Sequence, residues 1–213
     1  MTVSNVPTDS HVASKPALKM AIIYHSNYGH TRKVAKAIEA GAQAYVQSTA
    51  KRHVEVRALD VDEMDWEFAD AAQMMVFGSA VYMGSITAEF KTFMDSTSKR
   101  WFHRKWHGKW AAGFANSGGL SGDKLAALQQ ICGFSMQHGM NWAGFPIMPT
   151  GHTEQDINRL SSFLGLMTQS GDASPEVTPG EGDIKSAKLF GEHLVQTLIS
   201  QPPSLPQLSE PQA

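Results

Sequence analysis

The stretch from Ala21 to Lys33 constrains the fold more than any other part of the chain. It begins with a short apolar run that ends at Tyr24, which predicts a buried strand. A small polar turn, Ser26 to Thr31, follows, and apolar residues then recur three or four positions apart, as in an amphipathic helix. Because the first backbone N–H groups of a helix lack partners, a strand, a turn and a helix start in this order predict an anion site.

The residues of this turn indicate which kind of anion it would hold. Ser26 and Thr31 supply hydroxyl donors, and Gly29 lets the backbone come close to a ligand. The stretch has neither the Gly-Lys-Ser/Thr of nucleotide P-loops nor the GxGxxG dinucleotide fingerprint. Such a turn suits a phosphate monoester that is held and not transferred, such as that of FMN. An ordinary strand–turn–helix corner capped by Ser or Thr has the same pattern.

Composition limits the partners and the compartment. The 213 residues carry a net charge of only −2, so neither nucleic acid nor an anionic membrane surface is expected as a partner. The single cysteine, Cys132, excludes an intrachain disulfide framework and fits a reducing compartment. No apolar run is long enough to span a bilayer, and no apolar signal-peptide core precedes Lys19, so we expect a cytoplasmic protein without stable membrane insertion.

Strand and helix patterns alternate along the rest of the chain. Strands are expected at 18–24, 54–59, 74–78, 109–115 and 142–147, and helices at 31–47, at 123–138 and from 184. A further helix is expected after Gly84, with Ile86, Phe90, Phe93, Met94 and Thr97 on one face. The helix at 123–138 is expected to turn Leu125, Leu128, Ile131 and Cys132 inward. This alternation predicts an α/β fold, a flavodoxin-like three-layer sandwich with a five-stranded parallel sheet in the order 2-1-3-4-5 and helices on both faces.

One domain is expected over residues 18–200. Residues 1–17 read as a disordered N-terminal tail, and residues 201–213, with four prolines, as a proline-rich C-terminal tail. Residues 151–182 are long and aperiodic, and so long a connection inside a domain is usually functional or disordered. The acidic residues between 60 and 72 do not have the spacing of an EF-hand loop and are interpreted as a solvated acidic face, so no metal site is predicted.

Three turns of ligand-binding character follow strands that are neighbours in the predicted order. They are Ser26–Thr31, Gly78–Gly84 and Asn116–Gly122. In open parallel sheets, ligands bind outside the carboxyl ends of the strands where the winding reverses. The sequence therefore predicts that the three turns converge on one crevice.

The residues of these turns carry a resemblance to a known family. Four motifs look like those of the WrbA-type NAD(P)H:quinone oxidoreductases, which are flavodoxin-like FMN proteins. The motifs are Ser26-Asn27-Tyr28-Gly29-His30-Thr31, Gly78-Ser79 through Gly84, Phe93-Met94-Asp95 ahead of Trp101, and Gln137-His138-Gly139-Met140. The resemblance covers about Lys19 to Ile199.

The resemblance implies FMN as the cofactor and assigns its contacts. Those residues are Ser26, Asn27, Tyr28, Gly29, His30 and Thr31 at the phosphate, Ala80, Val81 and Tyr82 at the isoalloxazine, and Asn116, Ser117, Gly118, Gly119, Leu120 and Ser121 at its other edge. The resemblance further implies that His138 contacts the flavin, that Tyr28 lies near the nicotinamide nucleotide and that Trp101 borders the substrate. It also implies a homo-oligomer, a tetramer or dimer, with the site shared between subunits.

The implied reaction carries two electrons from NAD(P)H to a quinone. Hydride passes through FMN by ping-pong kinetics, and His138 or Tyr82 gives a proton or hydrogen bond to the reduced quinone. The alternatives are a flavodoxin-like one-electron carrier and an NAD(P)H-dependent FMN reductase that uses other acceptors. The chain departs from the family at Ala80-Val81-Tyr82, where Pro-Thr-Arg is usual, so a cation near the flavin edge is missing.

The aromatic segment from Trp101 to Trp110 suggests where a subunit contact would form. Large aromatic residues and cations crowd together here, and such residues are enriched at interface centres. We therefore expect this segment at a subunit boundary beside the flavin. The alternative is that its tryptophans pack into the core of their own chain.

Overall fold

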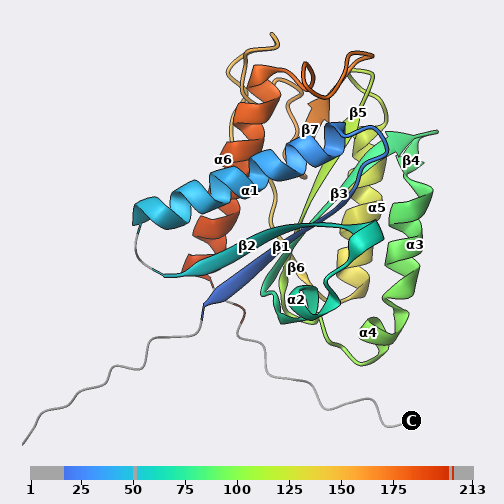
Figure 1. Cartoon of the computed structure of the whole chain (residues 1–213), viewed down its shortest axis with the longest axis vertical. Helices are drawn as coiled ribbons and strands as arrows, with labels where there is room; N and C mark the ends of the chain where they lie inside the picture. Colours follow the sequence, from blue (N-terminus) through green and yellow to red (C-terminus); the bar gives the residue numbers. More distant parts are fainter. Residues whose placement is uncertain (1–16, 50–51, 202, 204–213) are drawn as a thin grey trace, which may run out of the picture.

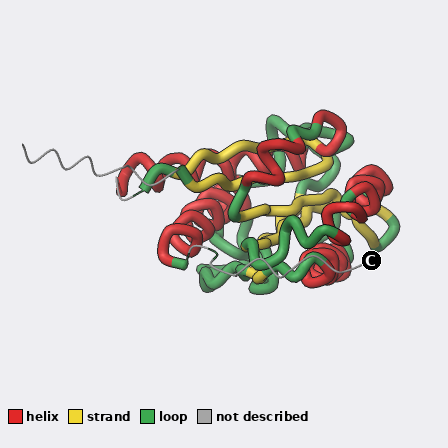
Figure 2. The backbone as a smooth tube through the Cα atoms, turned by 90° about the horizontal axis from the view of Figure 1, so that it is seen from below, coloured by secondary structure: helices red, strands yellow, loops and turns green. Residues whose placement is uncertain are grey.

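The computed structural model describes residues 17–49, 52–201 and 203. Figure 1 and Figure 2 show a twisted sheet with helices on both sides, so the expected three-layer α/β fold is confirmed. The two predicted tails lie outside the described residues, apart from Ala17, Gln201 and Pro203. None of the described helices is long and apolar enough to cross a membrane.

The elements follow one another in the predicted alternation. In chain order they are β1 (Leu18–His25), α1 (His30–Thr49), β2 (Val54–Asp60), the short 3-10 helix η1 (Val61–Glu63), α2 (Trp66–Ala71), β3 (Met74–Tyr82), β4 (Ser85–Ile86), α3 (Ala88–Ser96), α4 (Ser98–Phe102), β5 (Trp110–Ser117), α5 (Lys124–Gln137), β6 (Asn141–Trp142), β7 (Leu166–Gln169) and α6 (Glu181–Ser200).

The sheet departs from the prediction at its last strand. Its order is β2-β1-β3-β5-β6, with β7 also paired to β5, so the fifth position is filled by two short strands. Asn141 pairs with the start of β5, whereas Leu166 pairs with Phe114 further along it. The strand expected over 142–147 therefore ends at Trp142. Pro146 and Pro149 follow soon after, and a proline cannot donate to a strand ladder.

A second difference concerns the residues expected in the turn after β3. That strand continues to Tyr82, and β4 pairs back against it in an antiparallel arm. Met83 and Gly84 form the turn, with φ angles of 49° and 76°. Two central residues with positive φ are the geometry of a tight hairpin. Ala80, Val81 and Tyr82 therefore lie on a strand end and not in a loop, and Ile86 lies in β4 and not in the helix where it was expected.

The sheet is covered on both faces, which explains why its central strands are buried at nearly every position, whereas the edge strand β2 alternates. Along β1, Met20 and Ile22 pack in the layer under α1 and α6. The alternate residues, Ala21 and Ile23, pack in the layer formed with α2, α3 and α5. Successive side chains of a strand point to opposite faces, so a strand buried on both sides reads as a continuous apolar run.

Helices α1 and α6 touch through their backbones. A Cβ atom on Gly41 would lie 2.0 Å from the carbonyl oxygen of Lys188, and a Cβ on Gly191 would lie 2.0 Å from that of Ile38. No other residue fits at either position without separating the helices. The two glycines set the distance between α1 and α6. They thereby help to position α1, whose first residues belong to the Ser26–Thr31 turn.

Candidate functional site

Strand register brings the special turns to one edge of the sheet. His25 at the end of β1 pairs with Ser79 of β3, and Ala80 pairs with Asn116 of β5. Ser117 in turn pairs with Gln169, the last residue of β7. The turns after β1, β3 and β5 and the segment after β7 therefore leave the sheet side by side, at the upper end in Figure 1. We call this end the carboxyl edge.

The first turn offers a set of free donors at the start of α1. The Ser26 hydroxyl accepts the Gly29 N–H at 3.1 Å, and Gly29 has a φ of 91°. Within the described residues, the N–H groups of His30, Thr31 and Arg32 donate to no other group. Such donors at a helix N-terminus favour an anion. The donor set therefore fits a phosphate group, as the sequence predicted.

A fourth segment, residues 170–180, encloses this turn. The ring of His30 donates from Nε2 to the carbonyl oxygen of Ala173 at 2.8 Å, and Lys33 Nζ donates to the carbonyl oxygens of Glu176 and Pro179 at 3.3 Å each. Sequence reasoning missed these contacts. The signal that could have found them was the long aperiodic stretch before α6, expected to be functional or disordered.

Two exposed tyrosines lie next to each other at the carboxyl edge. Tyr28 is 72 % exposed and Tyr82 is 42 % exposed, and their rings meet edge to face with centroids 6.5 Å apart. Burial of the Tyr82 hydroxyl raises its pKa, and the neighbouring Tyr28 and Glu89 raise that pKa further. The Tyr82 hydroxyl therefore keeps its proton at neutral pH and remains a hydrogen-bond donor.

The third turn is fixed to the segment after β7. Asn116 Oδ1 accepts hydrogen bonds from the hydroxyls of Thr168 and Ser170, both at 2.8 Å. The Ser170 N–H donates to the Ser117 carbonyl at 3.0 Å. These contacts orient the Asn116 amide, whereas Gly118 to Ser121 are exposed. The third turn is therefore held against the segment after β7, at the same edge of the sheet as the Ser26–Thr31 turn.

His138 and Trp101 lie elsewhere. Helix α5 runs back from the carboxyl edge, and His138 follows its last residue, next to the start of β5, where the Gly108 N–H donates to the Gly139 carbonyl at 2.8 Å. Within one chain, these two residues are therefore not brought to the Ser26–Thr31 turn. The sequence motif could not reveal this, because it places His138 beside a turn without saying which edge that turn occupies.

The protonation state of His138 follows from its contacts. The Thr97 hydroxyl donates to the Met94 carbonyl at 2.7 Å, so it accepts from His138 Nε2–H at 2.9 Å. Burial, together with the nearby charges of Arg104 and Arg100, lowers the pKa of His138 to about 4. The ring is therefore neutral at pH 7, and its buried Nδ1 has no hydrogen-bond partner among the described residues.

A cavity of about 390 Å³ lies beside His138, lined also by Trp101, Phe134, Met94 and Gln137. Trp101 is 41 % exposed at its rim. Trp106 is fully buried, and its Nε1 donates to Asp70 Oδ1 at 2.8 Å. The expectation of a subunit contact can therefore apply to Trp101 and Phe102, but not to Trp106, which packs into the core of its own chain.

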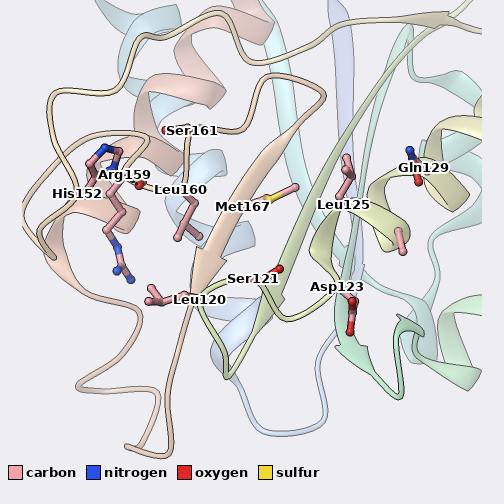
Figure 3. A pocket seen from close by; sticks show the side chains of 11 residues that line it. Leu120, Ser121, Asp123, Leu125, Gln129, His152, Arg159, Leu160, Ser161 and Met167 are labelled. Carbon is pink, nitrogen blue, oxygen red and sulfur yellow. Dashed lines mark hydrogen bonds between the residues drawn. The ribbon is translucent and has the colours of Figure 1, made fainter.

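A larger groove of about 780 Å³ lies on the outer side of the third turn (Figure 3). Leu120 and Ser121 line it from the turn, Met167 from β7 and Leu125 from α5. Leu125 was expected to point inward, but it is 52 % exposed. The helix instead buries Lys124, Ala127, Leu128, Ile131 and Ser135. Leu128 and Ile131 are buried as expected, whereas Lys124 and not Leu125 fills the inward position of the first turn of the helix.

Comparison with known proteins agrees with this geometry. The family model for NADPH-dependent FMN reductase matches residues 18–152. Flavodoxin FldP of Pseudomonas aeruginosa strain UCBPP-PA14 is 36 % identical over 183 residues, covering 84 % of this chain and 95 % of the relative. An NAD(P)H dehydrogenase (quinone) of Rhizobium rhizogenes strain K84 is 26 % identical over 193 residues, covering 84 % and 96 %.

A solved structure is similar over most of its length. The flavodoxin, WrbA-like protein from Agrobacterium tumefaciens has a TM-score of 0.65 and 31 % identity, covering 87 % of this chain and 99 % of that one. The fold and the carboxyl edge thus define a flavodoxin-like FMN-binding oxidoreductase. The chain belongs to the NADPH-dependent FMN reductase family and is of the WrbA type, with FMN as its cofactor.

Proposed function

We propose that this protein is an FMN-dependent NAD(P)H:quinone oxidoreductase whose FMN lies at the carboxyl edge. The observation that carries the proposal is the pair of exposed tyrosines, Tyr28 and Tyr82, beside a turn with free N–H donors. When bound, FMN supplies a ring that takes and returns a hydride. An open aromatic mouth suits planar substrates that use one position in turn, as a ping-pong reaction requires.

Different residues of the chain bind different parts of FMN and its substrates. Ser26, Thr31 and the first N–H groups of α1 hold the phosphate, and residues 80–82 and 116–121 border the ring. Tyr28 is placed to contact the nicotinamide nucleotide. The Tyr82 hydroxyl, with its raised pKa, is the proton or hydrogen-bond donor to a reduced quinone. These roles agree with the exposed positions of both tyrosines.

A second candidate function is one-electron transfer. It is favoured by the higher identity to flavodoxin FldP, 36 %, than to the NAD(P)H dehydrogenase (quinone), 26 %. The two functions differ in what NAD(P)H does to the protein. A quinone reductase takes two electrons directly from NAD(P)H, whereas a carrier of this kind receives single electrons from a protein partner.

Anaerobic titration with NADH and then NADPH tests the proposal. We expect one of them to bleach the visible flavin absorbance directly, without a large radical signal, and a quinone added next to restore it. A stable radical that accumulates during the titration, or no reduction by either nucleotide, would instead support the electron carrier.

We further propose that the working protein is a homo-oligomer, in which Trp101 and His138 of one copy border the FMN of another. Both residues lie away from the carboxyl edge of their own chain, beside a cavity with exposed aromatic rims. His138 is neutral, its Nε2–H is taken by Thr97 and its ring is only 2 % exposed, so Trp101 and not His138 makes the open contact and His138 does not serve as a proton donor.

Light scattering of the wild type and of a Trp101→Ala/Phe102→Ala variant tests this assembly. We expect the wild type to be a dimer or tetramer at micromolar concentration and the variant to dissociate, because central aromatic residues of an interface contribute about 2 kcal/mol or more each. Phe163→Ala, which removes another exposed aromatic residue, is the matched control and should leave the assembly intact. A fully active wild-type monomer would contradict the shared site.

A further inference from the structure

Lys124, the first residue of α5, is a buried lysine directly under the third turn. Its side chain is fully buried, which is rare for a lysine. The ammonium donates to Ser117 Oγ at 2.7 Å, to the Gly119 carbonyl at 2.8 Å and to the Leu120 carbonyl at 3.0 Å. An ammonium has three donors, so all of them are used to hold this turn.

These contacts decide which way the peptide groups of the turn face. In a planar trans peptide, the carbonyl of one residue and the N–H of the next point in opposite directions. Because the Gly119 and Leu120 carbonyls point inward to Lys124, the N–H groups of Leu120 and Ser121 point away from it. Within the described residues, these two N–H groups donate to no other group.

We propose that Lys124 is a positioning residue for FMN, which turns the N–H groups of Leu120 and Ser121 toward the ring and places a buried positive charge beneath it. This inference rests on the placement of FMN proposed above. When the ring takes up two electrons and one proton, it gains a net negative charge. A buried cation close to the ring therefore stabilises reduced FMN more than oxidised FMN.

Lys124 keeps its positive charge at neutral pH although it is buried. Burial is the main cause that lowers the pKa of Lys124 to about 8; Asp183 opposes this shift and Arg159 adds to it. Since this pKa still lies above 7, the protonated form predominates there.

The test compares apoprotein of the wild type with Lys124→Met, which removes the donors and the charge at similar length. We expect the affinity for oxidised FMN to fall about tenfold and that for reduced FMN about a hundredfold. For a two-electron couple, this tenfold difference corresponds to a midpoint potential about 30 mV lower. Lys185→Met, which removes an exposed lysine paired with Glu181, is the matched control and should change neither quantity.

The outcomes separate this inference from the proposed function. If wild-type apoprotein does not bind FMN, the placement of FMN is wrong. If the wild type binds but Lys124→Met has unchanged affinity and potential, only the role of Lys124 is wrong. An equal loss for both redox states would reject the electrostatic part of that role.

Hydrogen exchange on the wild type needs no variant and therefore covers the case in which Lys124→Met does not fold. The amides of Leu120 and Ser121 should exchange more slowly once FMN is bound, because they become hydrogen-bonded to it. Unchanged exchange at both amides would overturn the proposed orientation of the turn.

Discussion

Replacing Ser26 and Thr31 together by alanine is expected to weaken FMN binding at least a hundredfold. In the placement of FMN proposed above, each hydroxyl donates to the phosphate, and a hydrogen bond to a charged group contributes about 1.5–3 kcal/mol. Two such losses add to about 3–6 kcal/mol. Titrating apoprotein with FMN and following the quenching of flavin fluorescence measures the dissociation constant.

The matched control removes two hydroxyls from the opposite end of the same helix. Ser48 and Thr49 close α1, and Ser48 Oγ donates only to the nearby Tyr45 carbonyl. A Ser48→Ala/Thr49→Ala variant should bind FMN as the wild type does. If the Ser26/Thr31 variant also binds with wild-type affinity, the phosphate is not held at this turn.

Removing one partner of the Arg159–Asp183 pair is expected to cost about 3–5 kcal/mol of the free energy of unfolding. Both side chains are almost completely buried, at 4 % and 2 % exposed, and two guanidinium nitrogens donate to the two carboxylate oxygens at 2.9 and 3.1 Å. Asp183 also accepts the Gln169 N–H at 2.9 Å, which connects α6 to the end of β7. Asp183→Asn leaves the buried arginine without its counter-charge.

Urea unfolding of the variant measures this loss, and the neighbouring pair on the same helix provides the control. Glu181 and Lys185 form an exposed ion pair, for which the expected contribution is below about 1 kcal/mol. Glu181→Gln should therefore leave the midpoint of unfolding nearly unchanged. If Asp183→Asn and Glu181→Gln lower the free energy of unfolding equally, the buried Arg159–Asp183 pair matters no more to stability than the exposed pair.

Most of the fold follows from periodicity in the sequence, and the exceptions have physical causes. Apolar runs such as Met74–Phe77 mark strands covered on both sides, and the spacing of Val34, Ile38 and Ala42 marks a helix with one buried face. The split fifth strand was not predictable in this way. Residues 166–169 are too few for a clear pattern, and their pairing depends on contacts with β5 more than forty residues earlier.

The candidate site was predicted where its residues are adjacent in the sequence and missed where they are not. The Ser26–Thr31 turn carries its own glycine and hydroxyls, so its local chemistry is readable. The enclosing segment around Ala173 and the anchoring of the third turn by Lys124 depend on tertiary contacts. A lysine in a helix ordinarily predicts an exposed face, so nothing in the sequence indicated that this one is buried.

The backbone contact between α1 and α6 has a consequence for biosynthesis. Val34 and Ile38 of α1 are fully covered only when Leu194 and its neighbours in α6 join the same layer. A chain still being translated therefore exposes this apolar face until α6 has emerged from the ribosome. Since exposed apolar surface promotes association of incomplete chains, the nascent protein should depend on chaperone binding until translation has passed α6.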